Sequence, residues 1–141
     1  MLKITLVNSF IVALVVMIHY EALFRLTTLM PAMQIRHRIR IVLGVFGALI
    51  AHAVEVWVFA LAYYLMDHSE GWGHLEGNFD HSLLDSVYFS FTTFSTLGFG
   101  DIQPIGHLRY LTGIEALTGL VLITWTASFL FLEMQRYWHS K

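Results

Sequence analysis

The sequence predicts an all-α membrane protein with three transmembrane helices and a re-entrant helix and loop between the second and the third. The first indication is composition, because 57% of the 141 residues are hydrophobic and only 13% are charged, whereas about a quarter of the residues in a soluble domain are charged. The second is the presence of three apolar segments long enough to cross a bilayer, which takes about 20 residues. The third is a shorter apolar run, residues 82–95, that ends in a glycine-containing loop.

The composition also limits what the protein can do. The absence of cysteine excludes disulfides and thiolate metal sites. The length fits one domain at most. We find no basic patch with interleaved aromatic residues, and we therefore expect no nucleic-acid partner. The chain divides into an N-terminal helix with its connector, residues 1–40, and a second unit, residues 41–141.

The first helix lies within residues 4–30, of which residues 4–26 are long enough to span. No small-x-small cleavage site follows Met17, so we interpret the segment as a retained helix rather than a signal peptide. Residues 31–40 form a polar connector that holds the densest positive charge in the chain, with Arg36, Arg38 and Arg40. The positive-inside rule places this connector in the cytoplasm and the N-terminus outside.

The second helix, residues 41–66, is about 39 Å long and leads into an external loop, residues 67–81. The loop contains no lysine or arginine, and Gly71, Gly73 and Gly77 argue against regular structure in it. Its carboxylates either concentrate cations at the membrane surface or are simply solvated. Its histidines have no fixed spacing, so we interpret them as solvated side chains. A metal-binding or pH-sensing role is the alternative. These ionisable loop residues are Asp67, His68, Glu70, His74, Glu76, Asp80 and His81.

The short helix, residues 82–95, begins with Ser82 and Asp85, a Ser-x-x-Asp spacing that can cap a helix start. The C-terminal end of such a helix presents partial negative charge to a cation. The loop after it, residues 96–101, reads Thr-Leu-Gly-Phe-Gly-Asp. Glycines alternating with larger residues suit a backbone with positive φ at alternate positions, which turns successive carbonyls to one side. The third helix follows over residues 107–134 and contains Glu115, Gly113 and Gly119, with Trp138 beyond it at the cytoplasmic interface.

The hexapeptide from Thr96 to Asp101 resembles the selectivity-filter signature of potassium channels, usually Thr-Val-Gly-Tyr-Gly-Asp. Residues 91–95, Phe-Thr-Thr-Phe-Ser, resemble the end of their pore helix, and the resemblance extends over about residues 82–131. It implies a two-span potassium channel of the small bacterial type with an extra N-terminal helix. Residues 41–66 are then the outer helix, 82–95 the pore helix, 96–101 the filter and 107–134 the inner helix of a pore domain.

The same resemblance implies the function of individual residues. Backbone carbonyls of Thr96, Leu97, Gly98 and Phe99 would hold potassium ions in place of their hydration shell. Four copies of the chain would form the pore in the bacterial plasma membrane, with no cofactor other than potassium. Leu97 and Phe99 replace the family's Val and Tyr, and the change to Phe removes a hydroxyl that braces the filter.

Further residues are expected to support this filter. Asp101 would lie at the outer mouth and tie the filter to the pore helix. In some relatives a pore-helix carboxylate pairs with it. Thr92 occupies that position here, so Tyr88 is the better candidate partner.

Other functions remain possible from the sequence alone. A weakly selective cation channel and a non-conducting membrane sensor or scaffold are the alternatives to a potassium channel. Gly-x-Gly-Asp also occurs in intramembrane aspartyl proteases, which need a second aspartate on another span. The other aspartates, Asp67, Asp80 and Asp85, lie outside the spans or at a helix start. We therefore expect no enzymatic activity.

Four ionisable residues lie inside the predicted spans and away from their ends: His19, His52, Glu55 and Glu115. Because such residues are costly in lipid, we expect them to face one another or the pore helix. We interpret them as a structural hydrogen-bonding cluster that ties the first helix to the pore. The alternative is a proton or metal sensor that biases gating. Gly113 and Gly119 either let the third helix bend during gating or permit close helix packing.

Overall fold

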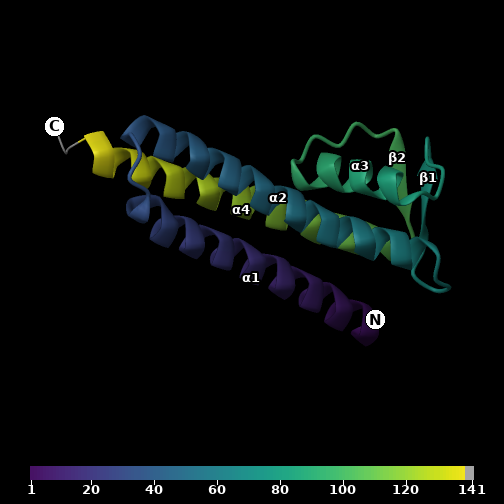
Figure 1. Ribbon diagram of the computed structural model, residues 1–141. Coiled ribbons are helices and arrows are strands. Elements are labelled where there is room, and N and C mark those ends of the chain that lie inside the picture. The colour runs from purple at the N-terminus through teal and green to yellow at the C-terminus, as the bar shows by residue number, and fades with distance from the viewer. Residues whose placement is uncertain (139–141) are drawn as a thin grey trace.

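The computed structural model describes residues 1–138 and combines three long helices, one short helix and a two-stranded ribbon (Figure 1). The elements are α1 (Leu2–Ala32), α2 (His37–Asp67), β1 (His74–Gly77), α3 (Leu83–Phe94), β2 (Ile102–Ile105) and α4 (Leu108–Trp138). The helices α1 and α2, and α4 from Leu108 to Arg136, are long and apolar enough to cross a membrane. The predicted three-span helical membrane protein is therefore confirmed.

The three long helices lie side by side and alternate in direction (Figure 1). Helix α1 contacts both α2 and α4, and α3 packs against α2 and α4. The N-terminus of α1, the short helix α3 and the ribbon lie at one end of the bundle. The connector between α1 and α2 and the C-terminal end of α4 lie at the other. The loop after α3 is thus far from the arginine-rich connector.

The connector between α1 and α2 is shorter than the sequence indicated. Helix α1 continues through Pro31 to Ala32, and α2 begins at His37, so only residues 33–36 lie between them. Arg38 and Arg40 belong to the first turn of α2. Charge marked this segment as polar, but arginine has a high helix propensity and does not end a helix. The last three residues of the predicted second unit, 139–141, lie outside the described part of the chain.

The prediction of an irregular external loop is wrong over four residues. Strand β1 pairs with β2 in antiparallel register, from His74 opposite Ile105 to Gly77 opposite Ile102. Glycine here permits pairing instead of preventing it. A Cβ at Gly77, whose φ is 108°, would lie 2.2 Å from the carbonyl oxygen of Asp101. The ribbon connects the end of the glycine-containing loop, residues 96–101, to the external loop.

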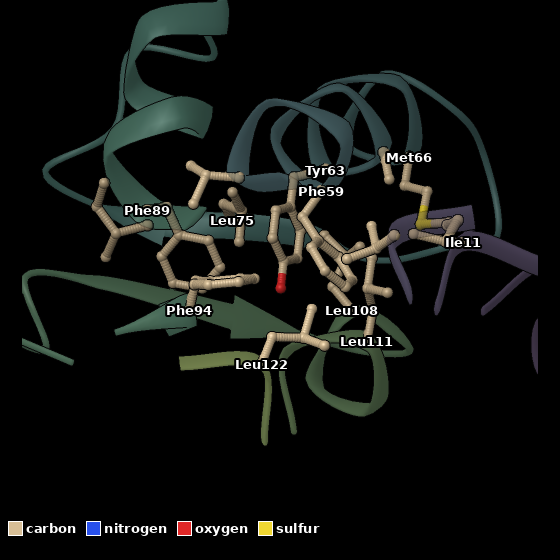
Figure 2. Packing of buried hydrophobic residues seen from close by; sticks show 14 residues of the cluster. Ile11, Phe59, Tyr63, Met66, Leu75, Phe89, Phe94, Leu108, Leu111 and Leu122 are labelled. Carbon is tan, nitrogen blue, oxygen red and sulfur yellow. The ribbon is translucent and has the colours of Figure 1, made fainter. Parts of the chain in front are cut away.

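The apolar core is formed by α2, α3, α4 and the ribbon, together with Ile11 and Val15 of α1 (Figure 2). Tyr63 and Phe89 pack edge to face, with ring centroids 5.0 Å apart, an arrangement that aromatic pairs favour. Phe59 and Phe94 pack beside them at 6.4 Å. Leu75 of β1 is also buried in this core. The core therefore holds the short helix α3 against the two long helices α2 and α4.

Candidate functional site

Helix α3 begins with the predicted cap and ends just before the glycine-containing loop. The Ser82 hydroxyl accepts a hydrogen bond from the backbone N–H of Asp85 at 3.1 Å, which satisfies one of the free donors of the first turn. The Asp85 carboxylate accepts from the backbone N–H of Asp80 at 2.8 Å. The helix ends at Phe94, one residue earlier than predicted. Its start is therefore fixed to the preceding loop.

The backbone of residues 96–100 alternates between two conformations. Thr96, Gly98 and Gly100 have positive φ values of 61°, 52° and 80°, and the residues between them do not. The loop is tied back to α3, since the N–H of Gly98 donates to the carbonyl of Thr92 at 2.9 Å. Alternation of this kind turns successive carbonyls toward the same side of the chain. The predicted positions of positive φ at the two glycines match the structure, and Thr96 adds a third.

Leu97 and Phe99, which lie between the positions of positive φ, have exposed side chains. Leu97 is 64% exposed and Phe99 66% exposed. The ring of Phe99 lies nearly parallel to that of Tyr88, with an interplanar angle of 6° and centroids 6.5 Å apart. Together with α3 they line an open apolar groove. The single chain therefore leaves this loop uncovered on one face.

Asp101 closes the loop and is held at two points. The Tyr88 hydroxyl donates a 2.9 Å hydrogen bond to Oδ2 of Asp101, and the Asp101 carbonyl accepts from the N–H of Asn78 at 2.9 Å. The hydrogen bond from Tyr88 to the Asp101 carboxylate raises the pKa of Tyr88 above its ordinary value, with smaller contributions from desolvation and from the Asp101 charge. Thr92 is buried and donates to the carbonyl of Phe89 instead. Tyr88 is thus the α3 side chain that reaches Asp101.

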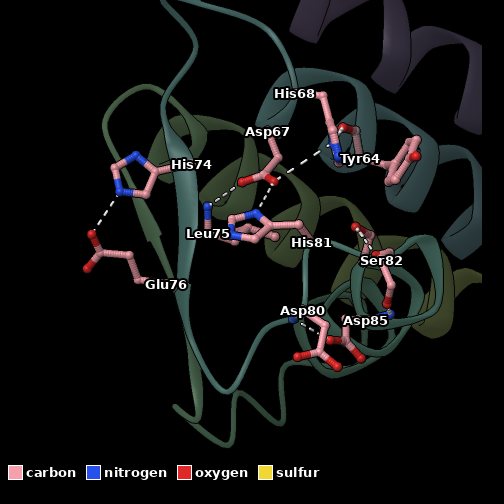
Figure 3. Close-up of polar contacts among 11 residues, drawn as sticks. Tyr64, Asp67, His68, His74, Leu75, Glu76, Asp80, His81, Ser82 and Asp85 are labelled. Carbon is pink, nitrogen blue, oxygen red and sulfur yellow. Dashed lines mark hydrogen bonds and ion pairs between the residues drawn. The ribbon is translucent and has the colours of Figure 1, made fainter.

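Ionisable side chains of residues 67–81 contact one another in two groups, Asp67 with His68 and His81, and His74 with Glu76 (Figure 3). Asp67 accepts from the N–H of Leu75 at 2.8 Å and contacts Nδ1 of His81 at 2.6 Å. His74 pairs with Glu76 at 2.7 Å. Within residues 1–138, the loop histidines and carboxylates do not assemble into a group of three ligands. Their pairing with neighbours in the loop fixes its shape.

Three of the four ionisable residues predicted within the spans come together, and one does not. Nδ1 of His19 lies 2.9 Å from Oε1 of Glu55, and Nδ1 of His52 lies 2.9 Å from Oε2. The hydroxyl oxygen of Thr126 lies 3.0 Å from Nε2 of His52 and 3.5 Å from Nε2 of His19. His19 and Glu55 are fully buried. This ring of four side chains joins α1, α2 and α4, and we call it the histidine cluster.

Glu115 belongs to a second buried network behind α3. Its carboxyl group contacts the hydroxyls of Tyr63 and Ser90, each at 2.5 Å. Ser90 also donates to the carbonyl of Val56 at 2.9 Å. Glu115 therefore connects α4 to α2 and to the middle of α3. Ser90, Tyr63 and Thr126 could not be identified as partners from the sequence, because hydroxyl residues are frequent in all of these segments.

The two glycines of α4 differ in their surroundings. A Cβ at Gly119 would lie 2.1 Å from the carbonyl oxygen of Phe94, at the end of α3. A Cβ at Gly113 would meet no atom within 4 Å. Gly119 is thus required for close packing of α4 against α3, and Gly113 is not.

Comparison with protein families finds one match. A family described as "Ion channel" matches residues 51–136, which is more than half of the chain and includes α3, the loop after it and nearly all of α4. Neither the curated proteins nor the solved structures contain a significant match.

Proposed function

Because the chain belongs to the ion channel family and has three helices able to cross a membrane, we propose that it conducts potassium ions passively and selectively. In this proposal residues 96–101 are the selectivity filter, α3 is the pore helix, α2 the outer helix and α4 the inner helix. Four copies of the chain close one pore. The proposal assigns no enzymatic reaction to the chain, and Asp101 serves as a filter anchor through Tyr88.

The observation that carries the proposal is the alternating backbone of Thr96, Gly98 and Gly100. Rings of backbone carbonyls replace the hydration shell of potassium in selective filters. Irregular backbone at membrane depth is tolerated only where it lines a cavity or is buried in protein. The loop follows the C-terminal end of α3, whose partial negative charge favours a cation.

The surface of the filter segment supports assembly from several copies. Each chain supplies one such loop, and one loop cannot surround an ion. Leu97 and Phe99 stand beside an apolar groove of α3. Neighbouring copies that cover these side chains would bring the carbonyl faces of the four loops together around one axis.

A flux assay on the purified full-length protein in liposomes tests the proposal. Potassium and rubidium are expected to pass, while sodium and lithium are strongly excluded. Equal permeability to sodium and potassium would instead indicate a weakly selective cation channel. A tetramer that passes no ion would indicate a non-conducting sensor or scaffold.

The variant Gly98→Ala is expected to abolish flux, and Gly100→Ala likewise. An L-residue in the left-handed region costs about 1–2 kcal/mol, and four copies would multiply that cost in one ring. Gly71→Ala is the matched control, because Gly71 also has positive φ, at 84°, with no atom near its would-be Cβ, but lies in the external loop. Wild-type flux is expected for this control. Normal selective flux in Gly98→Ala would contradict the assigned filter.

A further inference from the structure

We propose that His19, His52 and Glu55 form a binding site for one divalent transition-metal ion, with Zn²⁺ as the probe. The site lies at the junction of α1 and α2 and is separate from the filter. It goes beyond ion conduction, and its test does not depend on flux.

The ligand atoms are already close together. One atom from each of the three side chains lies within 4.8 Å of the others, and each Nδ1 lies 2.9 Å from a carboxylate oxygen. Imidazole nitrogen and carboxylate oxygen bind zinc at about 2.0–2.2 Å, so two ligands of one tetrahedral ion lie roughly 3.3 Å apart. A widening of about half an ångström at each nitrogen–oxygen pair would bring those atoms to the spacing of two ligands of one ion.

The outer sides of both rings support the same assignment. A histidine that binds a metal through one nitrogen usually donates its other N–H to a second group, which fixes the ring. Both Nε2 atoms face the hydroxyl oxygen of Thr126, at 3.0 Å from His52 and 3.5 Å from His19. A hydroxyl oxygen has two lone pairs and can accept both N–H groups.

With both histidines neutral, hydrogen bonding alone satisfies this arrangement less well. If both neutral histidines donate from Nδ1 to Glu55, both Nε2 atoms become acceptors facing a hydroxyl with a single proton. One buried Nε2 then lacks a donor, and the cluster carries a net negative charge inside a span, which is costly. A metal ion bound at the Nδ1 atoms supplies positive charge and makes both Nε2 atoms N–H donors to Thr126. One doubly protonated imidazole would also satisfy the four side chains, and the Zn²⁺ titration below distinguishes the two.

The surroundings favour a cation and provide access to it. The ring centroid of His52 lies 5.7 Å from that of Phe94, the last residue of α3, and the C-terminal end of a helix attracts positive charge. His52 and Thr126 also line an open, mostly apolar pocket of about 430 Å³ between α2, the end of α3 and α4. A site with three protein ligands leaves one position for water, and this pocket lies beside it.

Metal binding to the chelator-treated full chain tests the proposal. The starting protein carries glutamine in place of His68, His74 and His81, which removes the exposed loop histidines as competitors. Calorimetric titration with Zn²⁺ is expected to give one ion per chain. Glu55→Gln and His19→Gln are each expected to weaken binding by at least about 100-fold, and Thr126→Val by about 10–100-fold.

Thr124→Val is the matched control for Thr126→Val. Thr124 lies on the same helix and donates only to the carbonyl of Leu120 in its own helix, so unchanged affinity is expected. Absence of binding, or affinity unaffected by Glu55→Gln, would overturn the proposal. If a variant fails to assemble, the X-ray absorption spectrum of Zn²⁺ bound to the starting protein identifies the ligands of the ion and tests the proposal instead. Two imidazole ligands with oxygen support the site, and a spectrum without imidazole refutes it.

Discussion

Thr96 has an unusual backbone for its residue type. A φ of 61° is an outlier for a β-branched side chain, and such conformations persist only where the surrounding structure determines them. Its N–H donates to the carbonyl of Thr93 at 2.9 Å, which holds it against the end of α3. The sequence predicted positive φ at the glycines because glycine adopts it freely. It could not predict the same for Thr96, where propensity argues against it.

Tyr88 offers a prediction on the outer mouth of the proposed filter. Tyr88→Phe removes the donor that holds Oδ2 of Asp101 while keeping the ring that stacks on Phe99. We expect channels that still select potassium but close several-fold sooner, measured as mean open time in single-channel recordings. Tyr110→Phe, at another exposed tyrosine of the chain, should leave open time unchanged. Equal open times in Tyr88→Phe and wild type would show that this bond does not stabilise the filter.

The same bond predicts a dependence on alkaline pH. Tyrosine ordinarily titrates near pH 10, and in the folded protein the pKa of Tyr88 is raised by its hydrogen bond to Asp101. The contribution of the bond is therefore fully present below about pH 10 and is lost as pH rises through the raised pKa. Open time of the wild type should fall across that range, and that of Tyr88→Phe should not.

At the scale of elements, local signals were predictable and long-range pairings were not. The bounds of α3 differ from the prediction by one residue at each end, because Ser82 provides a local cap. Strand β1 was missed because its partner β2 lies far along the chain. The four ionisable residues form two networks, since Glu55 and Tyr63 are eight residues apart on α2, which places their partners about two turns apart. Only packing of the helices reveals that separation.

The contact between α4 and α3 predicts opposite effects for two glycine substitutions. Gly119→Ala would push a methyl group against the carbonyl of Phe94 and is expected to destabilise the protein by about 1–3 kcal/mol, with reduced flux. Gly113→Ala meets no atom and replaces glycine with a better helix former, for a gain of up to about 1 kcal/mol. Thermal unfolding in detergent and liposome flux measure both variants. Reduced flux in a stable Gly113→Ala protein would show that α4 bends at this position.

At the scale of the whole molecule, the positions of charge define two ends. Arg36 of the connector, Arg38 and Arg40 of the first turn of α2, and Arg136 of α4 lie at one end of the bundle. The acidic external loop lies at the other end, where Lys3 and Arg109 are the exceptions. Many large apolar side chains, including Phe10, Phe24 and Phe46, are exposed along the helices between them. This distribution suits a multi-pass membrane protein, whose sides face lipid or neighbouring copies.

The orientation of this bundle is the last prediction. The positive-inside rule places the connector in the cytoplasm, so the N-terminus, the external loop and the outer mouth of the filter should face outward. The chain has no cysteine, so single cysteines can be introduced at exposed positions without a background signal. Ser69→Cys lies just after α2, and Gln34→Cys lies in the connector. In intact cells a membrane-impermeant thiol reagent should label the first and not the second, and both should react after the membrane is opened. Labelling of Gln34→Cys alone in intact cells would invert the orientation and with it the direction in which the filter faces.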